Sequence, residues 1–126
     1  MKTPHRWILV GLLVVLGAFA AYGCKDKKKN PMAPGPTADV TINITGQNGA
    51  TSYQPNPANV TVGQTVAWKN IDSMIHTATQ DGGGFDTGDV SPGLTSGLFT
   101  ITTAGDLPYR CSRHPGTMTG TLHVVP

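Results

Sequence analysis

Apolar and polar residues alternate over short stretches of this chain from about residue 39 onward. Within residues 39–45, Val40, Ile42 and Ile44 alternate with threonine and asparagine. Alternation with a period of two is typical of a strand that buries one face. Residues 120–124 show the same alternation, so we expect a second strand of this kind near the end of the sequence.

The stretch between these two strands predicts further short strands. Val60 and Val62 are followed by a Gly-Gln turn signal, and Val66 and Trp68 then repeat the same spacing. This pattern predicts a hairpin-like pair whose apolar side chains point inward, with Trp68 as a large aromatic residue of the core. Residues 53–57 contain two prolines, which remove donors from a sheet, so we expect this segment at an edge or in a crossover.

Turn signals separate the remaining candidate strands. The sequence D-G-G-G at residues 81–84 indicates a flexible turn, and Phe99 and Ile101 share one face of a later stretch. Residues 107–111 alternate again, with Tyr109 on the buried face. About seven short strands at regular spacing predict an all-β sandwich or barrel, and the second half shows no helical periodicity.

Residues 1–23 have the composition of a targeting segment. Lys2 and Arg6 precede an apolar run over residues 7–21, which is the order found in secretory signals. The run is shorter than the ~20 apolar residues of a membrane-spanning helix. It ends in A-Y-G-C, which resembles the lipobox of bacterial lipoproteins, where Cys24 would carry the lipid and begin the mature protein. An uncleaved signal anchor and a secreted soluble protein are the alternatives.

We expect residues 24–37 to form a flexible tether and residues 38–126 to form one globular domain. The tether holds four lysines, which repel one another, and three prolines, which favour extended backbone. Acyl chains on Cys24 would each contribute ~0.8 kcal/mol per buried CH₂ to membrane binding. We therefore expect a membrane-anchored lipoprotein whose domain lies outside the cytoplasm, on the periplasmic side or at the cell surface.

The charge of the domain excludes one class of partner. From residue 37 onward the chain has three basic and six acidic residues, a formal net charge of −3, whereas nucleic-acid binding needs a basic face. This segment has no glutamate and no evident acid–base pair, so we do not expect an enzyme. Cys24 and Cys111 are the two cysteines and form one possible disulfide; if Cys24 is lipidated, Cys111 is a lone thiol suited to ligation.

The densest group of candidate ligands lies near the end of the chain. Cys111, His114 and Met118 fall within eight residues, and together they offer a thiolate, an imidazole and a thioether. Soft sulfur donors with imidazole suit copper, and two histidines, one cysteine and a weak axial methionine form the blue-copper geometry. His76 is the candidate for the second histidine. We also expect Asn70 to bond toward this loop.

These motifs resemble those of the cupredoxin family, in particular the plastocyanin-, pseudoazurin- and amicyanin-like proteins. The matching pieces are V-x-W-x-N-x-D followed by a histidine, F-D-T-G-D-V-S-P-G, and Y-R-C-S-R-H-P-G-T-M-T-G. The resemblance implies an eight-stranded Greek-key β-sandwich that holds one type 1 copper ion through His76, Cys111, His114 and Met118. Three residues separate His114 from Met118, whereas amicyanin-like loops have two there and plastocyanin-like loops have four.

The resemblance implies a protein that passes single electrons between redox proteins, such as a c-type cytochrome or a reductase or oxidase, in transient complexes. We expect it to be a monomer. Exposed Arg110 and Arg113 would favour an acidic partner. Copper binding and delivery without electron transfer uses the same ligands and remains the alternative, and a metal-free structural module is a third. A backbone N–H near Thr77 is expected to bond the Cys111 sulfur and so adjust the reduction potential.

Overall fold

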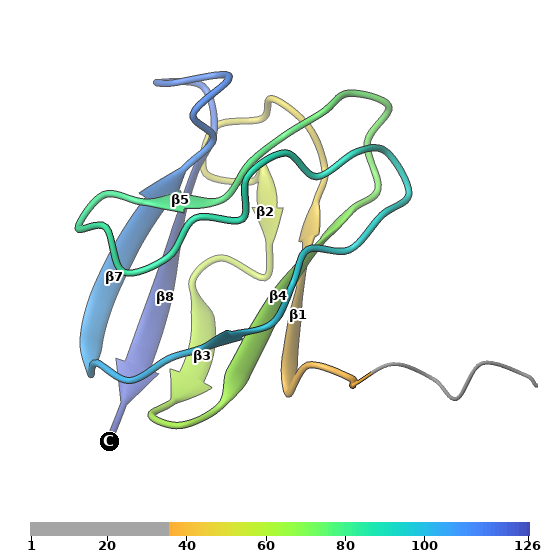
Figure 1. Ribbon diagram of the computed structural model, residues 1–126. Coiled ribbons are helices and arrows are strands. Elements are labelled where there is room, and N and C mark those ends of the chain that lie inside the picture. Colours follow the sequence, from red (N-terminus) through yellow and green to blue (C-terminus); the bar gives the residue numbers. More distant parts are fainter. Residues whose placement is uncertain (1–35) are drawn as a thin grey trace, which may run out of the picture. The chain divides into compact units, whose positions relative to one another are not determined.

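The computed structural model describes residues 36–126, which fold into two sheets of short strands packed face to face (Figure 1). Residues 1–35, with the predicted signal segment, Cys24 and nearly all of the predicted tether, lie outside the described residues. The strands of the described part are β1 Val40–Ile44, β2 Tyr53–Gln54, β3 Ala58–Thr61, β4 Thr65–Asn70, β5 Thr79–Gln80, β6 Phe99–Thr100, β7 Gly105–Arg110 and β8 Thr119–Val125.

The two sheets have the strand orders β2-β1-β4-β6 and β3-β8-β7-β5. In the first sheet β1 runs parallel to β4, while β2 and β6 are antiparallel edge strands. In the second sheet β3 runs parallel to β8, and β8, β7 and β5 are antiparallel neighbours. The predicted all-β Greek-key sandwich is confirmed, with the chain crossing repeatedly between the sheets.

The alternation of the sequence places the core between the sheets. Ile42 and Ile44 of β1 are fully buried, as predicted, and Leu122 and Val124 of β8 cover them from the opposite sheet. Trp68 is the central aromatic side chain of the core, with the rings of three neighbouring aromatic residues within 6 Å of it. The two-proline segment forms edge strand β2 and the crossover to β3, as expected.

The prediction of a hairpin over residues 60–68 is wrong. β3 pairs with β8, whereas β4 pairs with β1, so the two strands belong to different sheets. A turn in which Gln64 bonds back to Thr61 carries the chain from one sheet to the other. Val62 lies in this crossover and is 39% exposed instead of buried, because the alternation ends where the strand leaves its sheet.

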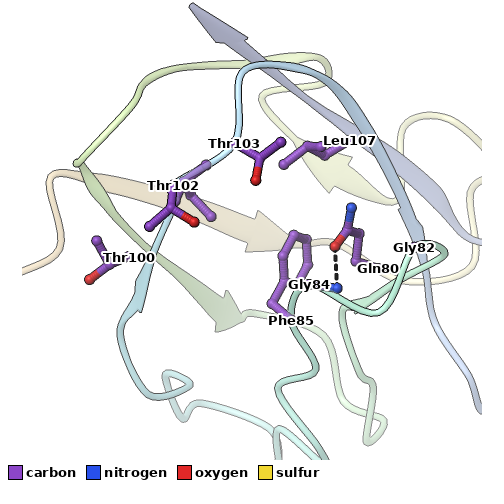
Figure 2. A pocket seen from close by; sticks show the side chains of 9 residues that line it. Gln80, Gly82, Gly84, Phe85, Thr100, Thr102, Thr103 and Leu107 are labelled. Atoms are coloured by element: carbon purple, nitrogen blue, oxygen red, sulfur yellow. Dashed lines mark hydrogen bonds between the residues drawn. The ribbon is translucent and has the colours of Figure 1, made fainter. Parts of the chain in front are cut away.

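Within residues 36–126 no helix is long and apolar enough to span a membrane. A shallow cavity of about 250 Å³ opens between the turn at residues 80–85 and the β6–β7 connection (Figure 2). Its polar lining comes from Gln80 and several threonines, and Phe85 and Leu107 contribute apolar surface. None of the candidate copper ligands lines this cavity, so it is separate from the predicted metal site.

Candidate metal centre

Two loops bring the predicted ligands together at the end of the sandwich shown at the top of Figure 1. His76 lies in the connection between β4 and β5. Cys111 follows directly after β7, His114 lies in the loop beyond it, and Met118 immediately precedes β8. The ligands therefore come from segments that are 35 residues apart in sequence and that only the folded sheets bring side by side.

Three donor atoms form a compact triangle. The Sγ atom of Cys111 lies 3.5 Å from Nδ1 of His114 and 3.9 Å from Nδ1 of His76, and the two Nδ1 atoms are 3.2 Å apart. The point equidistant from all three atoms lies about 2.1 Å from each, close to the length of a metal–imidazole bond. Cys111 and His76 are fully buried, so the described residues fit a metal ion that is shielded from water.

The orientation of the His76 ring is set by Asp72, a residue that the sequence reasoning did not single out. Nε2 of His76 lies 2.7 Å from Oδ2 of Asp72. The hydrogen bond from His76 is the main reason that the pKa of Asp72 lies below its usual value. An ionised carboxylate only accepts hydrogen bonds, so Nε2 carries the proton and the Nδ1 lone pair faces the other two donors.

Asn70 holds the loop that carries His76, but in a different way from the one expected. Its Nδ2 donates to the carbonyls of Met74 (2.6 Å) and Val90 (2.8 Å), and its Oδ1 accepts from the N–H of Asp72 (2.9 Å). The expectation that Asn70 bonds to the loop of Cys111 is therefore wrong. Its amide is fully buried and bonds within the His76 loop through Met74 and Asp72, while the bond to Val90 ties that loop to the β5–β6 connection.

Thr77 connects the two ligand loops, and one of its contacts was expected. Its backbone N–H donates to Sγ of Cys111 at 3.3 Å, which confirms the predicted bond to sulfur. The carbonyl of Thr77 accepts a hydrogen bond from the buried hydroxyl of Tyr53 (2.5 Å). Thr77 is thus fixed to β2 on one side and to Cys111 on the other, which limits movement of the thiol relative to His76.

Met118 closes the loop that begins at Cys111. The N–H of Cys111 donates to the carbonyl of Met118 (3.2 Å), and the backbone of Gly49 bonds to the residues on either side of Met118. The Met118 side chain is fully buried. The three-residue spacing after His114 is thus accommodated by a turn that leaves Met118 inside the fold.

The surface around the site is less basic than the sequence suggested. The guanidinium of Arg113 binds the carboxylate of Asp89 through two nitrogens, and Arg110 pairs with Asp81. Asp89 has a pKa below its usual value because of the hydrogen bond from Arg113. Each arginine is therefore matched by an acidic neighbour, and the expected positive patch does not exist.

The comparison with protein families agrees with this geometry. The family model for copper binding proteins of the plastocyanin/azurin family matches residues 38–125. The chain belongs to this family. Its members are small electron carriers and not enzymes, so the prediction of a non-enzyme is confirmed. Copper is the cofactor, and the cluster of His76, Cys111, His114 and Met118 is the type 1 copper site of this cupredoxin.

Solved structures of amicyanin are similar to this chain. A Cu(I) form of one amicyanin mutant is 25% identical, with 68% of this chain and 81% of that chain covered and a TM-score of 0.58. A Cu(I) form of a second mutant is 25% identical, and the match covers 71% of this chain and 85% of that chain with a TM-score of 0.60. A reduced form of a third mutant is 26% identical, and the match covers 71% of this chain and 86% of that chain with a TM-score of 0.59. No curated protein sequence matches the chain.

Proposed function

We propose that this protein carries single electrons between redox proteins outside the cytoplasm. The observation that carries the proposal is the buried triangle formed by one thiol and two imidazole nitrogens, all within 4.8 Å of one another. Copper supplies the one-electron couple when bound. The protein holds the donor atoms in one arrangement that suits both oxidation states of copper, with Met118 as a weak axial donor.

The contacts around the donors support a preorganised site. Asp72 orients His76, the N–H of Thr77 bonds Cys111, and the backbone pairing between Cys111 and Met118 closes the ligand loop. These contacts all come from residues of the protein and do not require a metal ion. A site that is held in this way undergoes little rearrangement when its charge changes, which favours rapid electron transfer.

The surface near His114 supports a transient encounter with a partner. Of His76, Cys111 and His114, the first two are buried and His114 is half-buried. The His114 ring is therefore the ligand that reaches toward the surface. Met74 and Ile75 are 46% and 40% exposed, and Gln47 bridges Met74 to Thr117 of the ligand loop. A small apolar surface of this kind suits a weak, short-lived complex with a cytochrome or a reductase.

The location of the protein is proposed from its first residues. The basic start, the apolar run and the sequence A-Y-G-C favour export and lipid attachment at Cys24. Residues 24–37 would then serve as the tether between the membrane and the copper domain. Metabolic labelling with a fatty acid, in the full chain and in Cys24→Ala, tests this part of the proposal. Label in both proteins, or in neither, contradicts it.

Copper delivery without electron transfer is the second candidate, since it needs the same ligands. Delivery requires the ion to leave readily, whereas three of the four ligands here are fully buried. This burial favours the electron carrier.

Spectroscopy and voltammetry of the copper-loaded full chain test the proposal. An intense blue thiolate-to-copper band, a narrow copper hyperfine splitting in the EPR spectrum and a reversible one-electron couple are the expected results. A tetragonal Cu(II) spectrum would show that Cys111 is not an equatorial ligand. A blue protein that gives up Cu(I) to competing chelators within seconds and has no reversible couple would favour delivery instead.

A further inference from the structure

A chain of hydroxyl groups runs from the copper ligand loop to an exposed carboxylate. Oγ1 of Thr77 accepts from the N–H of Ser112 (2.8 Å) and lies 3.0 Å from both Oγ of Ser112 and Oγ1 of Thr79. Oγ1 of Thr79 in turn donates to Oδ1 of Asp86 (3.0 Å). Ser112 follows Cys111 directly, so the chain begins one residue from the thiol.

The carboxylate determines the direction of the hydrogen bonds between hydroxyl groups in this chain. A hydroxyl group has one proton to donate and two lone pairs to accept with. Because ionised Asp86 can only accept, the proton of Thr79 points to it, and Thr79 must accept from Thr77. The proton of Thr77 is then used, so its two lone pairs accept the N–H and the hydroxyl proton of Ser112. Thr77 thereby reaches its full complement of three hydrogen bonds.

The turn after β5 places Asp86 at this point. An antiparallel bridge sets Asp86 opposite Thr79. Within the turn, the side-chain oxygen of Gln80 accepts a hydrogen bond from the N–H of Gly84, shown as the dashed line in Figure 2. Oδ1 of Asp86 also accepts from the N–H of Gly88 (2.9 Å). Oδ1 of Asp86 is therefore held by two donors, although the side chain is exposed.

We propose that Asp86 is a positioning residue for the Cys111 ligand, acting through Thr79, Thr77 and Ser112. With the acceptor in place, the Thr77 hydroxyl keeps Ser112 and hence Cys111 docked against the His76 loop. Without it, the Thr79 hydroxyl loses its fixed acceptor, the chain of hydrogen bonds is no longer polarised toward Asp86, and the Thr77 oxygen accepts the Ser112 N–H more weakly. The inference rests on the proposed copper electron-carrier function only for its effect on the reduction potential, since the docking itself exists without copper.

The test compares Asp86→Ala with Asp86→Asn in the full chain. Both variants remove the same charge, but the asparagine amide oxygen can still accept from Thr79 and Gly88, whereas alanine cannot. Asp106→Ala is the control for the loss of charge alone. It also removes an exposed carboxylate, but one that bonds His123 and has no contact with the hydroxyl chain. Hydrogen exchange of the Ser112 amide in the metal-free chain and the reduction potential of the copper-loaded chain are measured.

We expect Asp86→Ala to speed exchange of the Ser112 amide by about fivefold to tenfold, since a shared hydrogen bond is weakened. Asp86→Asn and Asp106→Ala should leave this exchange rate near that of the parent chain. The reduction potential of Asp86→Ala should lie below that of Asp86→Asn, because a looser N–H···S bond leaves more electron density on sulfur and stabilises Cu(II).

A second pair of variants covers the case in which Asp86→Ala disturbs the turn itself. Thr79→Val breaks the chain at its middle with a side chain of nearly the same shape, and Thr79→Ser restores the hydroxyl. Equal Ser112 exchange in Asp86→Ala and Asp86→Asn, together with equal exchange in Thr79→Val and Thr79→Ser, would overturn the inference. A parent chain without a reversible copper couple would overturn the proposed function, and the exchange comparison in the metal-free chain would still decide this inference.

Discussion

Replacing Met118 separates its role in packing from its role as an axial sulfur donor. Its side chain is fully buried at the start of β8, so Met118→Ala leaves a cavity that costs about 2–5 kcal/mol of unfolding free energy. For a domain of this size, that loss lowers the melting temperature by roughly 10–30 °C. Met118→Leu keeps the volume and should cost less than about 1.5 kcal/mol.

The leucine variant removes the sulfur with little change in packing, so it isolates the effect on copper. An apolar side chain at this position disfavours the more highly charged Cu(II), and we expect the reduction potential to rise. Met74→Ala is the matched control, because Met74 is the same residue type near the site but 46% exposed. It should change stability by less than about 0.5 kcal/mol and leave the blue band in place.

Thermal and denaturant unfolding of the metal-free chain, followed by voltammetry and visible spectroscopy of the copper-loaded chain, give the two readouts. A potential and a spectrum in Met118→Leu that match the parent chain would show that Met118 is a core residue without an axial role. A Met118→Ala variant as stable as Met74→Ala would refute the packing argument, since it would mean that the side chain is not enclosed by the fold.

Three further predictions follow from individual contacts. Tyr53→Phe keeps the ring but leaves the carbonyl of Thr77 without its buried donor. The free energy of unfolding, measured with denaturant, should fall by about 1–3 kcal/mol, and an unchanged value would contradict this. The backbone N–H of Thr65 holds the pKa of Asp39 below its usual value, so the contribution of this contact to stability is present at neutral pH and is lost as the pH falls below the usual range of a carboxyl group. Asp39→Asn should therefore reduce the drop in unfolding midpoint between about pH 6 and about pH 2.5, and an equal drop in both proteins would argue against the contact. Because Asp89 neutralises Arg113, association with a redox partner should depend only weakly on salt, and Asp89→Asn should steepen that dependence in stopped-flow measurements.

Much of the fold follows from local sequence patterns. The alternation in β1 and β8 and the spacing of Tyr109 and Cys111 identify buried faces, because side chains on a strand alternate with a period of two. The same reasoning failed at Val62. Periodicity reports which side chains are buried within a strand, but not which sheet the next strand joins.

The candidate ligands were also accessible from the sequence. Cys111, His114 and Met118 lie on one short loop, and residue type and spacing alone indicate a soft metal site. His76 could be assigned because it follows a recognisable strand motif. The motif also contains Asp72, but nothing in the spacing reveals that its carboxylate orients the His76 ring.

The residues around the ligands were decided by tertiary structure alone. Asp89 neutralises Arg113, 24 residues away. Asp86 bonds Thr79 locally, but it reaches the copper loop only through the contact between Thr77 and Ser112, which are 35 residues apart. Such contacts depend on how two loops approach each other once both sheets have packed. Local patterns along the chain are therefore enough to locate most of the strands, their buried faces and the ligand types. The folded sandwich determined the charge around the site and the hydrogen bonds that hold the ligands, because those depend on distances between groups that no local pattern records.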